Sequence, residues 1–138
     1  MTHVETYFAR SGCDNYVKID RSSCSTSRVA SLNTVVPQGV ELLFFVVGDY
    51  EHVLHNYLWK SRVNGEWFHN DTDVQEVLDE IRSGGVLVLE RISSQVEKGL
   101  TRYGKRLTAK QVSEGYGKKY AVVFGKRYEI VDNVIQFY

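Results

Sequence analysis

Three side chains that lie far apart in the sequence are of the types that phosphodiester hydrolysis requires. Tyr7, Arg28 and Glu51 provide a phenol, a guanidinium and a carboxylate. Cleavage of a phosphodiester uses an oxygen base near the attacking water, a cation on the phosphate and a carboxylate that holds a metal ion. Each residue alone has a structural interpretation: a packing tyrosine, a solvated arginine and an acid in the first turn of a helix. It is their joint order along the chain that favours a shared site.

Two short strands are expected to carry the first part of this site. Thr6–Ala9 reads as a strand, and the turn residues 11–15 predict that Tyr16–Asp20 returns as its antiparallel partner. Alternation places Val17 and Ile19 on one face of the second strand. The opposite face then carries three polar side chains: Tyr16, Lys18 and Asp20.

The next elements are expected to place Arg28 and Glu51 at or near helix starts. The serines and threonine of residues 22–27 can cap a helix that carries Arg28 and ends near Asn33. Val40–Val47 is the strongest strand in the chain and is expected to be buried. Asp49 is the expected N-cap of the helix that opens with Glu51.

A helix from about Asp71 is predicted by one apolar stripe: Val74, Val77, Leu78 and Ile81. Gly84-Gly85 ends it and predicts a boundary between a first domain, residues 1–85, and an extension, residues 86–138. The extension is expected to contain an amphipathic helix and a β-hairpin. The helix is marked by Leu89, Ile92, Val96 and Leu100, and the hairpin strands by 120–124 and 127–131, with Asn133–Tyr138 as a third strand.

These elements predict the α+β class, with a small antiparallel sheet flanked by helices. A chain of 138 residues with 43% hydrophobic residues supports one modest core. Cys13 and Cys24 do not form a disulfide framework, and we expect free thiols in a reducing cytoplasm. No apolar run reaches the roughly 20 residues of a membrane span, so no membrane partner is expected.

Charge is divided unevenly along the chain. Residues 1–82 carry 7 basic and 12 acidic side chains, whereas residues 83–138 carry 10 and 5. A basic half can bind a polyanion, or the two halves can attract each other within one molecule. For the first interpretation, the candidate nucleic-acid contacts are Lys105, Arg106, Lys118, Lys119, Lys126 and Arg127.

Five pieces of residues 5–82 resemble, in order, the motifs of the GIY-YIG nuclease superfamily. The similarity is greatest to a branch, frequent in phage and bacteria, whose second motif reads K-I-G and whose helix is followed by G-E-W-F. The matching pieces are Tyr7-Phe8, Val17-Lys18-Ile19, Arg28 to Thr34, Glu51 to His55, and Gly65-Glu66-Trp67-Phe68. The resemblance implies a metal-dependent DNA endonuclease in the cytoplasm of a bacterial or phage-infected cell.

The resemblance also implies roles for individual residues. Tyr7 would orient or deprotonate the attacking water, Arg28 would bind the scissile phosphate, and Glu51 would hold Mg²⁺ or Mn²⁺. His55, one turn after Glu51, would assist in proton transfer. Lys18 would contact phosphate, and Tyr16 would partly replace the tyrosine that Lys18 displaces.

The chain departs from the motifs at Glu5-Thr6, where the family has Gly-Ile, at Lys18, and at Asp20 in place of glycine. A carboxylate at Asp20 either repels phosphate or adds a ligand to the metal. The departures leave a second function open, a DNA- or protein-binding module of a phage or mobile element that has lost catalysis.

Two further interpretations concern side chains near the site. A zinc site formed by Glu51, His55 and His69 matches no strong ligand spacing. Trp67 and Phe68 are interpreted as core anchors rather than base-stacking platforms.

Overall fold

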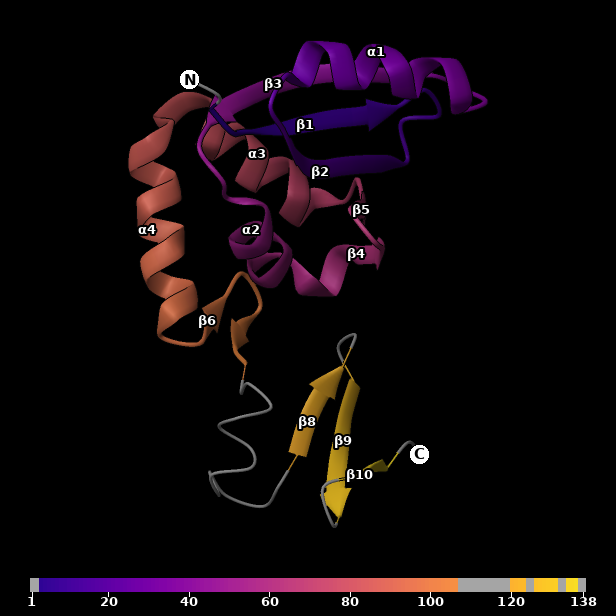
Figure 1. Ribbon diagram of the computed structural model, residues 1–138. Helices are drawn as coiled ribbons and strands as arrows, with labels where there is room; N and C mark the ends of the chain where they lie inside the picture. The colour runs from indigo at the N-terminus through magenta and orange to yellow at the C-terminus, as the bar shows by residue number, and fades with distance from the viewer. Residues whose placement is uncertain (1–2, 107–119, 124–125, 132–133, 137–138) are drawn as a thin grey trace.

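The computed structural model describes residues 3–106, 120–123, 126–131 and 134–136, and its architecture is α+β (Figure 1). A five-stranded antiparallel sheet has the order β3-β1-β2-β5-β4. Its strands are β1 (Glu5–Ser11), β2 (Tyr16–Ser22), β3 (Val40–Val47), β4 (Arg62–Asn64) and β5 (Trp67–His69). The helices are α1 (Ser25–Val35), α2 (Glu51–Tyr57), α3 (Thr72–Gly84) and α4 (Val86–Glu97), and a 3-10 turn, η1 (Trp59–Ser61), follows α2.

The predicted hairpin of β1 and β2 is confirmed, and both strands are longer than expected. Its register pairs Tyr7 with Asp20 and Ala9 with Lys18. In the turn, Asp14 has a φ of 65°, a conformation that aspartate tolerates better than most residues. The register therefore puts the predicted tyrosine directly opposite the aspartate that departs from the family motif.

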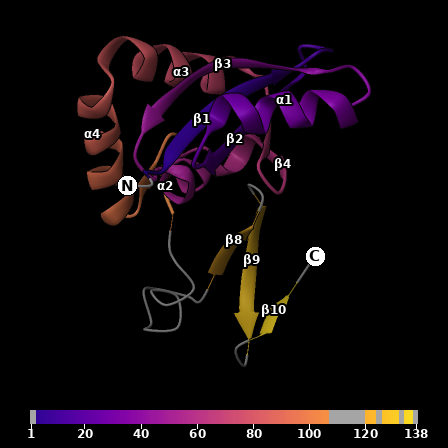
Figure 2. The ribbon, with the colours of Figure 1, turned by 45° about the horizontal axis from the view of Figure 1, so that its top comes forward.

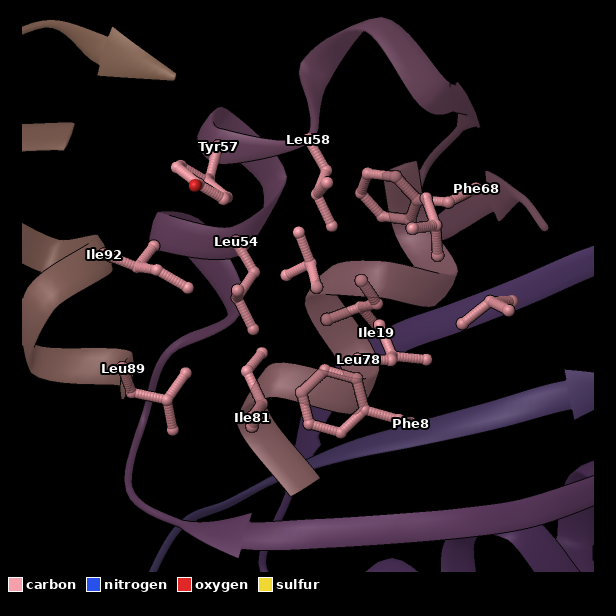
Figure 3. Close-up of a cluster of buried hydrophobic side chains, with 13 residues drawn as sticks. Phe8, Ile19, Leu54, Tyr57, Leu58, Phe68, Leu78, Ile81, Leu89 and Ile92 are labelled. Atoms are coloured by element: carbon pink, nitrogen blue, oxygen red, sulfur yellow. The ribbon is translucent and has the colours of Figure 1, made fainter. Parts of the chain in front are cut away.

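The two faces of the sheet are covered by different helices. α1 lies on one face in both views (Figures 1 and 2), where Val29 packs with Tyr7 and Ala9 in a small core cluster. The larger core lies on the opposite face and gathers Phe8, Ile19 and Phe68 with side chains of α2, α3 and α4 (Figure 3). As alternation predicts, Val17 and Ile19 point into this larger core, away from the polar side chains of β2.

β3 has the predicted bounds but is not a buried strand. It is the edge of the sheet, and its only strand partner among the described residues is β1. Phe45 and Val47 are 41% and 60% exposed. The strand is apolar because its buried side chains pack on two core clusters. Its outer edge is partly protected by Arg82, which donates a hydrogen bond to the carbonyl of Leu43.

α3 and α4 share the larger core, although the predicted boundary after residue 85 falls between them. Leu89 and Ile92 of α4 are fully buried in the same cluster as Ile81 of α3 (Figure 3). α3 begins where expected, and Asp71 caps it, because its carboxylate accepts from the amide of Val74. Gly85 separates the helices with a φ of 60°, which favours glycine. The first helix of the predicted extension thus packs on the unit that contains the sheet.

Residues 100–106 continue from α4 and contact the same unit. β6 (Leu100–Thr101) and β7 (Gly104–Lys105) form a two-stranded ribbon, so Leu100 is in a strand and not in the predicted helix. Arg102 forms ion pairs with three acids of α3: Asp73, Glu76 and Glu80. Arg102, from the basic half of the chain, is therefore attracted to acidic residues of the other half within the same molecule.

A second sheet is formed by β8 (Tyr120–Val123), β9 (Lys126–Val131) and β10 (Val134–Gln136). It confirms the predicted hairpin and third strand, but Lys126, expected between the two strands, belongs to β9 and pairs with Val123. Lys118 and Lys119, two of the candidate nucleic-acid contacts, lie outside the described residues. Within the part of the chain that the structure describes, no helix has the length and apolar character of a membrane span.

Candidate active site

Tyr7 and Asp20 form the centre of a cluster of ionisable groups. The Tyr7 hydroxyl donates a hydrogen bond to Oδ2 of Asp20 over 3.2 Å, across the hairpin. Tyr7 is fully buried. Burial, followed by the negative charge of Asp20, raises the pKa of Tyr7 far above its ordinary value. Tyr7 is thus a neutral phenol at physiological pH, with its proton directed at a carboxylate.

Arg28 reaches this phenol from the first turns of α1. Interaction with the Arg28 guanidinium lowers the pKa of Tyr7, and this opposes the effect of Asp20, which raises it. Arg28 is exposed, and within residues 3–106 it has no ion pair. By contrast, Lys18 and Arg21 are both held by carboxylates. Arg28 is therefore the cation of this cluster that has its charge available for another anion.

The position of Arg28 depends on Glu5, two residues before Tyr7 on β1. Oε1 of the buried Glu5 accepts a hydrogen bond from the amide of Ser25 at 2.9 Å, at the start of α1. The N-cap residue, Cys24, makes no side-chain capping bond. The prediction that a serine or threonine of residues 22–27 caps this helix is therefore wrong, because the cap comes from a neighbouring strand.

Thr6, the next residue on β1, holds the segment that leads into the helix carrying Glu51. Its hydroxyl donates to the carbonyl of Gly48 and accepts from the amide of Tyr50, at 2.7 and 2.9 Å. Asp49, the predicted N-cap, instead forms an ion pair with Arg21. The two residues that replace Gly-Ile of the family motif thus fix the starts of α1 and α2, on which Arg28 and Glu51 stand.

Glu5 predicts a specific dependence of stability on pH. Hydrogen bonds from His3 and Ser25 lower the pKa of Glu5 from 4.5 to about 2. A carboxylate with a lowered pKa stabilises the fold fully above pH 4.5 and loses this effect as the pH falls toward 2. We expect a higher urea midpoint for the wild type than for Glu5→Gln at pH 6, and a difference that shrinks between pH 4.5 and 2. A difference independent of pH would contradict the capping role.

Asp20, the partner of Tyr7, is one of three clustered carboxylates. Oxygen atoms of Asp20, Glu51 and Glu66 lie within 4.8 Å of one another, and each residue is partly exposed. They come from β2, the start of α2 and the turn between β4 and β5. Burial, followed by repulsion from Asp20, raises the pKa of Glu51. The cluster therefore carries a concentration of negative charge that a cation would relieve.

Lys18 partly neutralises these carboxylates. Its buried ammonium lies 3.5 Å from Oδ2 of Asp20 and 3.6 Å from Oε2 of Glu66. The same nitrogen lies 5.4 Å from the centre of the Trp67 ring. Lys18 was predicted to contact phosphate, but in the structure its charge is already shared by two acids.

His55 is close to Glu51, as the helical spacing predicts, and the two line a pocket of about 370 Å³ with Arg21 and Asp49. The Nε2–H of His55 donates to the carbonyl of Ile19 over 2.8 Å. Burial lowers the pKa of His55, so the imidazole is neutral at physiological pH. Within the described residues, His55 and His69 do not join Glu51 in a group that could hold a metal ion.

Other predicted site residues lie elsewhere. Tyr16 is 38% exposed and stands beside His69 at the opposite end of β2 from Asp20. Arg106 stacks on the Trp59 ring at 4.7 Å and is only partly exposed, whereas Lys105 is exposed. For Lys126 and Arg127 the structure describes only that they belong to β9. The sequence assigned Glu66 no specific role. Its position before Trp67, in the G-E-W-F piece, could have marked it as a candidate site residue.

Fold and site together define a small α+β protein that gathers a phenol, an arginine and three carboxylates at the end of β2. In comparisons with protein-family models, curated proteins and solved structures, nothing matched this chain. The proposed activity accordingly rests on the residues of the cluster and on the resemblance of the motifs.

Proposed function

We propose that this protein is a metal-dependent endonuclease that hydrolyses DNA phosphodiester bonds by a mechanism of the GIY-YIG type. One observation carries the proposal: Tyr7 donates a hydrogen bond to Asp20, Arg28 lies near the Tyr7 phenol, and an oxygen of Glu51 lies within 4.8 Å of one of Asp20. A phenol, an available guanidinium and a carboxylate in one cluster meet the chemical needs of phosphodiester cleavage.

In this proposal Arg28 binds the scissile phosphate. It is exposed on α1, and no carboxylate of residues 3–106 pairs with it. A guanidinium can donate two parallel hydrogen bonds to phosphate oxygens and offset the charge that develops during attack. Because Tyr7 is buried, we propose that substrate reaches its hydroxyl when the exposed Arg28 side chain turns from the phenol to the phosphate.

Tyr7 transfers a proton without becoming a free phenolate. Its pKa is too high for ionisation at neutral pH, and its proton already points at Asp20. As water attacks phosphorus, the water proton passes to the phenol oxygen and the phenol proton passes to the Asp20 carboxylate. Asp20, the departure from the family motif, thereby acquires a function as the proton acceptor.

The carboxylates fit a hard divalent cation. Mg²⁺ and Mn²⁺ bind oxygen ligands, and Asp20, Glu51 and Glu66 offer three oxygens within 4.8 Å of one another. Glu51 and Glu66 are the residues that would hold the ion, together with Asp20 before it accepts a proton. Such an ion would polarise the phosphate and stabilise negative charge on the leaving oxygen.

The test is nicking of supercoiled plasmid by wild type and by Glu51→Gln, each with Mg²⁺, with Mn²⁺ and with EDTA. We expect nicking by the wild type only with a divalent ion, and a loss of about 100-fold or more in Glu51→Gln, because the amide keeps the shape of the side chain but not its charge. Equal nicking by both proteins would assign the activity to a contaminant and reject the proposal.

The alternative is a nucleic-acid- or protein-binding module that has lost catalysis. Two observations favour it: Tyr7 has no exposed surface, and the ammonium of Lys18 already pairs with Asp20 and Glu66. Salt-sensitive DNA binding without cleavage in Mg²⁺ or Mn²⁺ would select this module. Absence of DNA binding would indicate a protein partner instead.

A further inference from the structure

A pocket of about 600 Å³ opens beside the proposed active site and has no role in the mechanism above. It lies between the C-terminal end of α1, where Val36 and Gln38 line it, and β4, where Val63 and Asn64 line it. Its volume is within the range of small-molecule binding sites. The pocket is therefore large enough for a nucleobase.

Two aromatic side chains line this pocket. Tyr16 of β2 is 38% exposed, and Trp67 of β5 is partly exposed. The antiparallel register pairs Trp67 with Lys18 and His69 with Tyr16, so both rings project from the same face of the sheet. Aromatic rings on an open surface are platforms on which bases stack, whatever the base.

The polar groups of the pocket suit the edge of a base. The side-chain amides of Gln38 and Asn64 each carry donors and an acceptor. Within residues 3–106 neither amide forms a side-chain hydrogen bond. Both side chains are exposed and so are open to a ligand, and the edge of a base offers donors and acceptors that can pair with them.

One wall of the pocket, Trp67, lies near the carboxylate cluster. Lys18 lies over the Trp67 ring at 5.4 Å, and the same ammonium is 3.5 Å from Asp20, the partner of Tyr7. A wall of the pocket is thus one side chain away from the groups around the scissile phosphate. Trp67 therefore forms the side of the pocket nearest to these groups, and Tyr16, at the start of β2, forms a side farther from them.

We propose that this pocket binds the unstacked base of a nucleotide that flanks the scissile phosphate, with the base against Tyr16 and Trp67. This inference rests on the proposed function, since the phosphate cluster determines what the neighbouring pocket receives. It assigns the substrate class as DNA with an unpaired or extruded base next to the cut.

The experiment measures binding in EDTA, so that cleavage does not contribute. Fluorescence anisotropy would measure the affinity of the protein for a labelled oligothymidylate of about ten nucleotides and for an abasic chain with the same number of phosphates. Tyr16→Ala is expected to weaken binding of oligothymidylate by roughly fivefold or more, and to leave the weaker binding of the abasic chain unchanged. Tyr16→Phe keeps the ring and should bind as the wild type does.

A matched control separates stacking from a general loss of aromatic surface. Phe45→Ala removes a ring that is 41% exposed on β3, outside the pocket, and should change neither affinity. Equal affinity of the wild type for the two chains, or an equal effect of Tyr16→Ala on both, would overturn the pocket assignment. If the base-dependent effect is present but Glu51→Gln nicks as the wild type does, the pocket stands and the proposed catalysis fails.

Discussion

Replacing Arg28 by alanine is expected to slow magnesium-dependent plasmid nicking by roughly 100- to 1,000-fold, the usual cost of removing one charge-stabilising group from a transition state. The expectation follows from how charge is distributed around Tyr7. Lys18 and Arg21 are each paired with carboxylates, whereas Arg28 has no ion pair among the described residues 3–106. No neighbouring cation in this cluster is free to replace it at the phosphate. The initial nicking rate at saturating Mg²⁺ is the measurement.

Arg28→Lys and Arg91→Ala are the informative controls. Lysine keeps the charge but cannot form two parallel hydrogen bonds to a phosphate, so we expect partial activity. Arg91 is exposed on α4, where it pairs with Glu80, and its loss should leave the rate unchanged. Because Arg28 is exposed, its removal should alter stability by no more than about 0.5 kcal/mol. A rate within a factor of three of the wild type in Arg28→Ala would remove Arg28 from the mechanism.

Replacing Ile92 by alanine is expected to destabilise the protein by about 2–5 kcal/mol. Ile92 is fully buried in the core that also contains Phe8 of β1 and Leu54 of α2 (Figure 3). Removing three carbons there leaves a cavity that the packed neighbours fill only in part. The measurement is the free energy of unfolding from urea titration, followed by circular dichroism.

Leu87→Ala is the matched control for this prediction, because Leu87 is on the same helix and 83% exposed. Its loss should change stability by less than about 0.5 kcal/mol. If Ile92→Ala were as mild as Leu87→Ala, α4 would not belong to the core of the sheet-containing unit. Residues 1–85 would then be expected to fold alone, as the boundary predicted from the sequence implies.

Several local features of the fold were predictable from the sequence. The apolar stripe of α3 and its start near Asp71 match the structure, as do the bounds of β3. The alternation of β2 was also correct, since Val17 and Ile19 are buried on one face. These features depend on residues within one or two turns of each other, whose spacing is visible in the chain.

The caps of α1 and α2 were not predictable in the same way. Polar residues before both helices gave a reasonable local expectation, yet Glu5 on β1 caps α1, and Thr6 on β1 binds the amide of Tyr50, the residue before α2. A strand residue can cap a helix only when the sheet and the helix are already packed together. The register that brings Tyr7 opposite Asp20 likewise turns a departure from a motif into a hydrogen-bonded partner.

The sequence by itself determined the four helices, the longer strands, the faces of the hairpin and the three residue types that suggested phosphodiester chemistry, but not the short strands β4 to β7. Tertiary structure alone decided that β3 is an edge strand, that α4 shares the main core, and that Glu66 and Lys18 join Asp20 and Glu51. The physical reason is distance. Periodicity and capping act between residues a few positions apart, whereas burial and the meeting of charges depend on contacts between segments that only the folded chain brings together.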